Sequence, residues 1–220
     1  MKNLVKFTLI TALVFTACTG NTTSTGLDDD NETDNSNVEQ GTTMPEITDA
    51  DWSKGNLEST IILVEYSDLQ CPACKSREPL VEKLIQEFGN HIRFVYRHMP
   101  LSSMHKNAQK AAEATEAAGM QDKFWEMHDL LFEKQKDWSD LSNTDFIETL
   151  ATYAEEIGLD LEQFNSDLES SEVEDAVDED KEGAIDAGVN STPTFFLNGS
   201  KINPKTYEEY RELIRQAIEA

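Results

Sequence analysis

The sequence predicts an α/β fold in which a block of helices interrupts a β-sheet. Apolar strand-like segments at 59–66 and 91–98 flank a helical pattern, and strand signals return only at 194–202. Between these parts, residues 104–186 show helical periodicity throughout. We therefore expect an N-terminal β-α-β unit, a helical insertion and a C-terminal β-β-α unit.

The N-terminal unit begins with a β-branched apolar strand at 59–66, which is interrupted only by Glu65. An apolar stripe at helical spacing runs through 80–88, and a second strand at 91–98 is stopped by Pro100. Because the links between these elements are short, the two strands are expected to be parallel and joined by a right-handed crossover.

The helical insertion and the C-terminal unit follow from spacing and turn chemistry. Apolar residues recur at helical spacing in three stretches of the insertion. These stretches are 111–118, 124–132 and 146–157. Asn198-Gly199 is typical of a two-residue hairpin turn, and the last helix is expected to turn an apolar face inward between 207 and 217.

The composition divides the chain into five predicted parts. These are a signal peptide at 1–17, an acidic tether at 18–50, the first part of the α/β domain at 51–103, the helical insertion at 104–186 and the C-terminal part at 187–220. The tether is rich in Thr, Asn, Asp and Ser and contains no aromatic residue. Such a segment cannot bury enough apolar surface to fold.

The predicted signal peptide has Lys2 and Lys6 before an apolar run at 9–15 that is too short to span a bilayer. Small residues precede Cys18, as in the bacterial lipobox, although Phe15 departs from the usual leucine there. We expect lipid attachment at Cys18. A plain secretory signal cleaved nearby and an uncleaved anchor are the alternatives.

The chain is strongly acidic, with 43 Asp and Glu against 18 Lys and Arg and a formal net charge of −25. This charge argues against nucleic acid as a partner. We interpret most of it as a solvated surface rather than an acidic binding site. In particular, the acidic run at 172–180 is expected to be a solvated helix face.

Cys71 and Cys74 are two of the three cysteines in the chain. A bridge between them closes too small a loop to stabilise the fold much, so a structural role explains them poorly. Cys71 is expected at a helix N-terminus, where unpaired N–H groups and the helix dipole favour its thiolate. Pro72 suits the first helical turn, and Cys74 lies one turn on, where it can resolve a mixed disulfide.

These features together resemble the thioredoxin fold of DsbA-type thiol-disulfide oxidoreductases, and in particular the exported BdbD-like branch. The resemblance covers 52–220 and includes the Cys-Pro-Ala-Cys segment, the Ser-Thr-Pro-Thr-Phe-Phe segment at 191–196 and the long helical insertion. Pro79 matches the proline that kinks the active-site helix in this family, and 97–101 matches the segment that leaves the second strand.

The resemblance implies a set of site residues. Pro193 is expected to be cis beside the cysteine pair, and the backbone of Thr192 to pair with a substrate chain. Pro72 and Ala73, between the cysteines, are expected to contact substrate too. Glu65 matches the buried acid that helps the resolving cysteine lose its proton. As an alternative, Glu65 reaches solvent at the strand end.

The expected function is donation of disulfides to exported proteins through the Cys71-Cys74 pair, with no other cofactor. The resemblance implies reoxidation by a membrane partner of the DsbB or VKOR type, and the lipid would hold the enzyme at the extracytoplasmic face of the membrane, in the cell envelope. Ala73 departs from the polar residue of strongly oxidising members, so a reductase or isomerase remains an alternative. A non-catalytic envelope lipoprotein is a second one. No metal is expected, because the four histidines lack zinc-site spacing.

Overall fold

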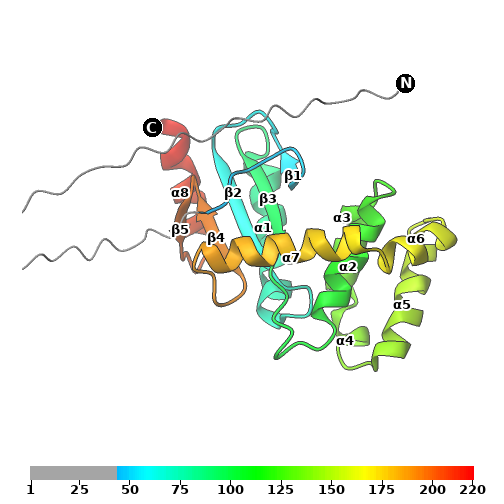
Figure 1. The fold of residues 1–220 in the computed structure, drawn as a ribbon. Helices are drawn as coiled ribbons and strands as arrows, with labels where there is room; N and C mark the ends of the chain where they lie inside the picture. Colours follow the sequence, from blue (N-terminus) through cyan, green and yellow to red (C-terminus); the bar gives the residue numbers. More distant parts are fainter. Residues whose placement is uncertain (1–43) are drawn as a thin grey trace, which may run out of the picture. The chain divides into compact units, whose positions relative to one another are not determined.

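A computed structural model describes residues 44–220, so the predicted signal peptide and Cys18 lie outside the described part. The centre of the fold is a five-stranded mixed sheet in the order β1-β3-β2-β4-β5 (Figure 1). Its strands are β1 (Trp52–Gly55), β2 (Ile62–Ser67), β3 (Arg93–His98), β4 (Thr194–Leu197) and β5 (Ser200–Ile202). The predicted α/β class with a helical insertion is confirmed.

The two central strands and helix α1 (Pro72–Phe88) form the expected crossover unit. Strand β2 is parallel to β3, and Glu65 is the register partner of Tyr96. Strand β4 pairs antiparallel with β2, and β5 with β4. The turn between β4 and β5 has positive φ at both Asn198 and Gly199, as the predicted two-residue hairpin requires.

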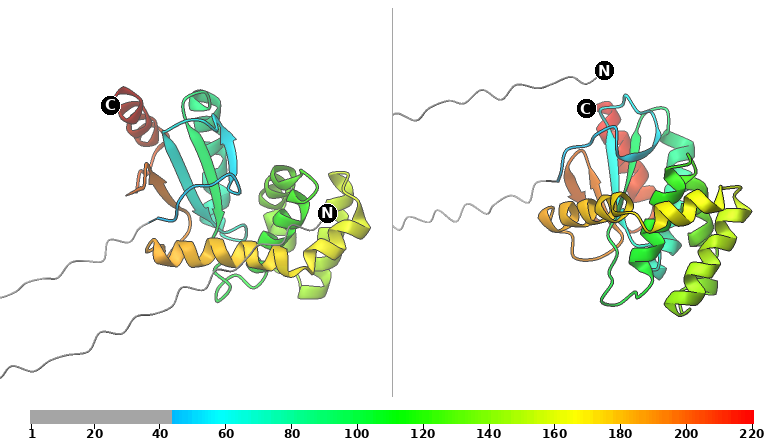
Figure 2. Two further views of the ribbon diagram at one scale, coloured as in Figure 1. Left: turned by 45° about the horizontal axis from the view of Figure 1, so that its top comes forward. Right: turned by 45° about the vertical axis from the view of Figure 1, so that its right-hand side comes forward.

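The two faces of the sheet have different coverings. Alternate residues of β2, such as Leu63, pack in the core with α1 and with α8 (Tyr207–Glu219). The residues between them, such as Val64, pack against the C-terminal part of α7 (Ser171–Asp186), which crosses the other face (Figures 1 and 2). By this alternation, Glu65 lies on the same face of the sheet as α1.

The insertion is helical, as predicted, and lies beside one end of the sheet (Figure 2). Its elements before α7 are α2 (Ala108–Gly119), α3 (Phe124–Glu133), α4 (Gln135–Trp138), α5 (Asn143–Glu156) and α6 (Leu161–Leu168). The side chain of Trp138 is fully buried and stacks on Phe146 with ring centroids 4.8 Å apart. Within the described residues, no helix is long and apolar enough to cross a membrane.

The structure adds a strand that the sequence analysis missed. Strand β1 pairs antiparallel with β3, with Trp52 opposite Tyr96. Its four residues carry no alternating apolar pattern, so only pairing with a distant part of the chain defines it. The strand that was predicted at 59–66 begins later, at Ile62.

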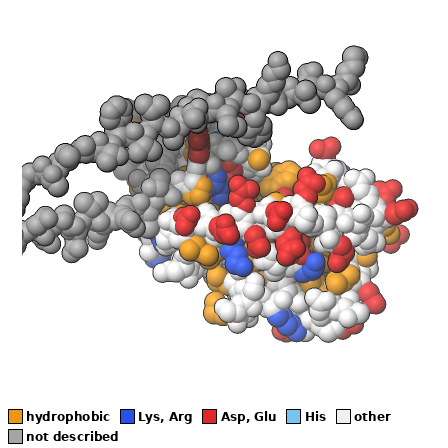
Figure 3. Space-filling model, in the orientation of Figure 1, with side chains coloured by type: hydrophobic (Ala, Val, Ile, Leu, Met, Phe, Trp, Pro, Cys, Tyr) orange, Lys and Arg blue, Asp and Glu red, His pale blue; other side chains and the backbone are white. Residues whose placement is uncertain are grey.

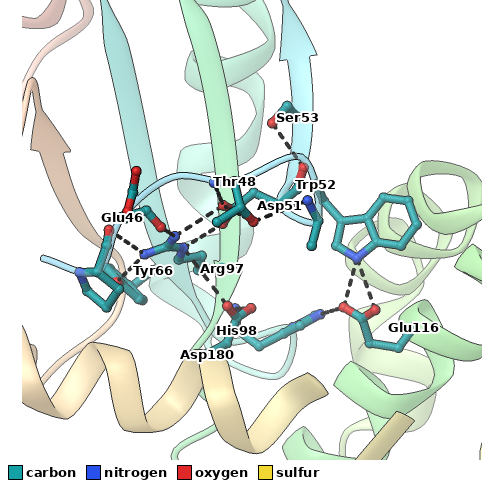
Figure 4. Close-up of polar contacts among 12 residues, drawn as sticks. Glu46, Thr48, Asp51, Trp52, Ser53, Tyr66, Arg97, His98, Glu116 and Asp180 are labelled. Carbon is teal, nitrogen blue, oxygen red and sulfur yellow. Dashed lines mark hydrogen bonds and ion pairs between the residues drawn. The ribbon is translucent and has the colours of Figure 1, made fainter. Parts of the chain in front are cut away.

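Residues 44–51, which we call the N-terminal strap, belong to the folded domain although the tether was predicted to extend to residue 50. Arg97 binds the strap through the Glu46 carbonyl at 2.8 Å and the Asp51 carboxylate at 2.6 Å (Figure 4). Met44 and Ile47 of the strap pack on the sheet. The predicted tether therefore ends before the strap, because a buried arginine supplies partners for backbone that the composition marks as unstructured.

The acidic run at 172–180 is only partly a solvated face. Glu172, Glu174 and Glu179 are exposed, and acidic side chains gather over this side of the molecule (Figure 3). Asp180 is different, because its carboxylate accepts a 2.8 Å hydrogen bond from the backbone N–H of His98. Burial is the main reason why the pKa of Asp180 is raised to about 7. The interpretation as a solvated face is wrong for this residue.

We predict that Gly119→Ala destabilises the fold by about 1–3 kcal/mol, in spite of the better helix propensity of alanine. A Cβ at position 119 would lie 2.6 Å from Cη2 of Trp52. That indole cannot easily move, because it stacks on Phe124 at 4.2 Å and donates to Glu116 at 2.8 Å. Urea unfolding measures the loss, and in a Trp52→Phe background, which lacks the clashing atoms, the added alanine should cost much less. A Gly119→Ala protein as stable as the parent would contradict this packing.

Candidate active site

Cys71 occupies the N-cap of α1, and Pro72 is the first helical residue, as predicted. The turn before the helix is held by Asp68, whose buried carboxylate accepts from the N–H groups of Gln70 at 2.7 Å and Leu101 at 2.9 Å. His105 Nδ1 lies 2.7 Å from Oδ2 of Asp68, the same oxygen that accepts from Leu101. Sequence reasoning did not single out Asp68, because nothing local marks it as a turn anchor.

The two thiols are free in this structure and differ in their surroundings. Cys71 is 7% exposed and Cys74 is 1% exposed. The sulfur of Cys71 lies 3.6 Å from the carbonyl oxygen of Thr192. The outer thiol is therefore the one that a substrate can reach, and the inner one can react only with a group already attached to Cys71.

The electrostatics make Cys71 the thiolate. The hydrogen bond from the Cys74 thiol is the largest reason why the pKa of Cys71 is lowered to about 5, and backbone N–H groups of Cys74 and Ala73 add to it. The helix N-terminus, from which the sequence predicts this effect, is therefore not its main cause. The Cys74 thiol thus lowers the pKa of Cys71 more than the helix amides do.

Cys74 has the opposite character. Burial, followed by its hydrogen bond to Cys71 and the charge of Glu65, raises the pKa of Cys74 well above its ordinary value. At neutral pH this thiol keeps its proton. To act as a nucleophile it needs a nearby base, which has to be inside the protein because Cys74 has almost no contact with solvent.

Glu65 is that candidate base. It is 2% exposed, which excludes the alternative that it reaches solvent at the strand end. Burial and then the charge of Glu78 raise the pKa of Glu65 to about 8. Its Oε2 atom has no hydrogen-bond partner among the described residues. The carboxyl group is therefore protonated at neutral pH and close to the point where it can either give or take a proton.

The loop that carries Thr192 and Pro193 lies against the cysteines, and the peptide bond between these two residues is cis. A cavity of about 500 Å³ begins beside this loop. Pro193 lines it together with the cationic side chains Arg77, Lys201 and Lys205. The cavity therefore adjoins the residue whose carbonyl meets Cys71.

The helical insertion also contacts the site through Gln135. The side-chain amide of this buried residue donates to the carbonyls of Leu69 at 2.8 Å and Cys71 at 3.0 Å. Because it bonds two carbonyls of the turn that leads into α1, Gln135 fixes the position of Cys71. A polar residue in a four-residue helix gives no signal in the sequence for this role.

The predicted site residues are brought together in the fold. Glu65, Cys71, Cys74 and the cis loop lie where β2, α1 and β4 meet, and Pro72 and Ala73 form the exposed first turn of α1. Apart from the thiols, Glu78, His128 and Asp129 form a group whose ligand-type atoms lie within 4.8 Å of one another. Cys71 and Cys74 are not part of that group.

The arrangement can be compared with known proteins. The family model described as Thioredoxin matches residues 48–216. The chain belongs to the thioredoxin family. Among solved structures, BdbD from Bacillus subtilis in the oxidised form is 24% identical with a TM-score of 0.68, covering 77% of this chain and 94% of that one. The predicted likeness to DsbA-type and BdbD-type members of the thioredoxin fold is confirmed.

Two further solved structures extend this comparison. A thioredoxin-like oxidoreductase from Silicibacter pomeroyi is 27% identical with a TM-score of 0.64, covering 77% of this chain and 93% of that one. Wolbachia pipientis α-DsbA1 is 21% identical with a TM-score of 0.69, covering 79% and 93%. These likenesses show that the thioredoxin fold with its helical insertion is shared along nearly the whole of these proteins.

The curated relatives are much longer proteins. The Na⁺/H⁺ antiporter NhaA 1 of Salinispora arenicola is 44% identical over 158 residues, which are 72% of this chain and 23% of that protein. NhaA 1 of Mycolicibacterium vanbaalenii is 39% identical over 176 residues, or 78% and 27%. The chain thus spans about a quarter of the length of these relatives, and the antiporter name belongs to the whole of each of them.

Proposed function

We propose that this member of the thioredoxin family is a thiol-disulfide oxidoreductase that donates disulfides to exported proteins. The observation that carries the proposal is the contrast within one pair: the accessible Cys71 is held as a thiolate, and the buried Cys74 keeps its proton beside Glu65. Such a thiolate stabilises the reduced pair, which makes the oxidised pair a better donor.

The forward reaction starts from the Cys71-Cys74 disulfide. A substrate thiolate attacks the sulfur of Cys71, so that a mixed disulfide forms and Cys74 leaves as a thiolate. Glu65 supplies the proton that Cys74 then takes up. A second substrate thiolate attacks the substrate sulfur of the mixed disulfide and releases Cys71 as a thiolate. Two electrons have passed from the substrate to the enzyme, and the substrate holds a disulfide.

The cis loop provides the place for the substrate chain. The carbonyl of Thr192 is 3.6 Å from the Cys71 sulfur, and β4 continues from Pro193 with extended backbone. We infer that a substrate chain pairs with the backbone of Thr192 and passes over Pro72 and Ala73. The cavity beside Pro193 then receives side chains next to the reacting cysteine.

The direction of electron flow is tested by equilibrium with glutathione. A donor should have a reduction potential clearly less negative than the value of about −270 mV for thioredoxin. Ala73 supplies no side-chain hydrogen bond, so the potential depends on the Cys74 thiol and the helix amides. A potential at or below that of thioredoxin would favour the alternative of a reductase or isomerase.

The proposed location is the extracytoplasmic face of a membrane in the cell envelope. It depends on lipid attachment at Cys18, which lies outside the described residues and stays a prediction. A lipid anchor would hold the domain near a membrane redox partner of the DsbB or VKOR type. Mass determination of the mature protein tests the anchor, since acylation adds a defined mass at Cys18 and removes the preceding residues.

Trapping of substrates tests the enzymatic role itself. We predict that Cys74→Ser accumulates mixed disulfides between Cys71 and exported proteins, because the resolving thiol is gone while the attacking thiolate remains. Non-reducing gels followed by mass spectrometry detect these adducts, and Cys71→Ser is the matched control that should trap none. An absence of adducts in cells would favour a non-catalytic envelope lipoprotein.

A further inference from the structure

A buried proton donor has to exchange its proton with solvent in every reaction cycle. In the proposed forward reaction Glu65 protonates Cys74, and in the reverse reaction it takes that proton back. Glu65 is 2% exposed. In the proposed mixed disulfide, the substrate is bonded to Cys71 and covers that side of the site. The side of the site that faces the substrate is therefore closed when Glu65 must regain or lose its proton. A second way out of the protein is needed.

A row of polar groups starts at Glu65 and leads away from Cys71, and its inner members are buried while Glu78 is half-buried. Tyr96 is the register partner of Glu65 on β3. Glu78 lies one helical turn after Cys74 on α1, on the same side of the helix. The charge of Glu78 is the second largest cause of the raised pKa of Glu65, which fits their closeness across the interface between sheet and helix.

Helix α3 completes the row and brings it to the surface. The ring of His128 meets the ring of Tyr96 edge-on, with centroids 4.6 Å apart. His128 Nδ1 lies 2.7 Å from Oδ1 of Asp129, whose side chain is 56% exposed. The ligand-type atoms of Glu78, His128 and Asp129 all lie within 4.8 Å of one another. His128 itself is 1% exposed, so it joins buried groups to an exposed carboxylate.

Several polar atoms along this row lack a hydrogen-bond partner within the described part of the chain. Within the described part of the chain, four buried polar atoms of β2, β3 and α3 have no partner. They are Oε2 of Glu65, Oγ of Ser67, the hydroxyl of Tyr96 and Nε2 of His128. Buried polar groups of this kind usually bind internal water, which also conducts protons between side chains.

We propose that Glu78, His128 and Asp129 form the solvent end of a proton path that serves Glu65 and Cys74. This inference rests on the proposed oxidoreductase function. In the forward direction a proton enters at Asp129, passes His128 and Glu78, and replaces the one that Glu65 gave to Cys74. In the reverse direction the Cys74 proton leaves by the same groups. No electron moves along the path.

Glu78, His128 and Asp129 could instead bind a metal ion, but their surroundings disfavour this role. The ammonium of Lys54 lies 3.8 Å from Oδ1 of Asp129, so a cation is already present at the open side. The group offers only one imidazole and two carboxylates as ligands. The imidazole of His128 is already hydrogen-bonded to the carboxylate of Asp129. A proton relay needs neither a free coordination site nor a further ligand.

The charged and titratable groups around the path come from five elements. Those facing Glu65 are Arg77, Glu78 and the two cysteines of α1, with Tyr96 of β3 and Tyr210 of α8. Those facing His128 are Glu78 of α1, Asp129 of its own helix, Lys54 of β1 and Tyr96 of β3. Removal of Glu78 would change the pKa of Glu65 as well as the path. Variants at His128 and Asp129 are therefore the cleaner tests.

The experiment measures release of a cysteine peptide from a preformed mixed disulfide on Cys71, a step in which Cys74 has to lose its proton. His128→Phe and Asp129→Asn in the full chain should slow release about tenfold or more and increase the solvent deuterium isotope effect. A small buffer such as imidazole at high concentration should restore part of the rate. A path changes forward and reverse rates equally, so the equilibrium constant with glutathione should stay unchanged.

Glu82→Gln is the matched control, because Glu82 also pairs with Lys54 at 3.8 Å but lies outside the group. It should release peptide at the rate of the unmodified chain. The proposal is overturned if His128→Phe and Asp129→Asn release peptide at the unmodified rate and isotope effect. It is also overturned if their slower release comes with an equal change in the glutathione equilibrium or in Glu82→Gln. If the unmodified chain exchanges no disulfides at all, the proposed function fails, and the path with it.

Discussion

Cys71→Ser should leave no measurable disulfide exchange with peptide or protein substrates. With a pKa of about 5, Cys71 is more than about nine-tenths thiolate at neutral pH, and thiolate is the form that reacts. Cys74 cannot replace it, because burial raises its pKa and only 1% of it is exposed. The serine hydroxyl is not a nucleophile toward disulfides. Oxidation of a reduced cysteine peptide, followed by fluorescence, measures the loss.

Cys74→Ser is the comparison for this result, because it keeps Cys71 and removes only its neighbour. It should still attack a small aromatic disulfide, because Cys71 is retained and the serine hydroxyl keeps a hydrogen-bond donor at position 74. If Cys71→Ser kept more than about a tenth of the exchange rate, the assignment of the attacking thiol would be wrong.

Glu65→Gln should stabilise the oxidised protein at neutral pH while it slows the resolution step by Cys74. Burial raises the pKa of Glu65 from an ordinary value of 4.5 to about 8. The folded state therefore holds a proton that the unfolded state has lost at pH 7, at a cost of roughly 3 kcal/mol. Glutamine has no such cost but offers no base, so stability and the rate of resolution should change in opposite directions.

The pH dependence of this effect has a definite sign. The pKa of Glu65 is higher in the folded state than in the unfolded state. The contribution of this group to the free energy of unfolding is therefore most favourable below pH 4.5, and it is lost as pH rises through about 8. Urea unfolding of oxidised Glu65→Gln and oxidised parent should therefore give similar stabilities near pH 4.5 and a growing difference up to pH 8. The oxidised forms are used because their cysteines do not titrate. A difference independent of pH would contradict the raised pKa.

Strand β2, the β4-β5 hairpin and the cysteine site were predictable because their signals are local. A β-branched apolar run marks β2, Asn198-Gly199 marks the hairpin, and two cysteines around a proline mark the start of α1. Each of these follows from a few neighbouring residues. The placement of Glu65 on the α1 side of the sheet also follows from the alternation along a strand.

The missed features depend on contacts between distant parts of the chain. Strand β1 exists because Trp52 pairs opposite Tyr96, and the N-terminal strap is ordered because Arg97 binds its carbonyls and Asp51. Gln135 reaches the Cys71 carbonyl from the insertion. No spacing rule connects these positions, so only the fold could reveal them.

The cause of the lowered pKa of Cys71 was also only half predictable. A helix N-terminus can be read from the sequence, and its amides do contribute. The stronger effect needs the Cys74 thiol to point at the Cys71 sulfur. That orientation depends on Cys74 being buried on the side of α1 that faces the sheet, which the fold alone determines.

Titration of Cys71 in the reduced full chain tests the account most directly. The ultraviolet absorbance of the thiolate and the rate of alkylation at Cys71 should both rise with a midpoint near pH 5. The midpoint should move upward in Cys74→Ala, where the donated hydrogen bond is lost. A midpoint near the ordinary value of 9.0 in the unmodified chain would contradict the account, because the pair would then have no built-in preference for Cys71 as the thiolate.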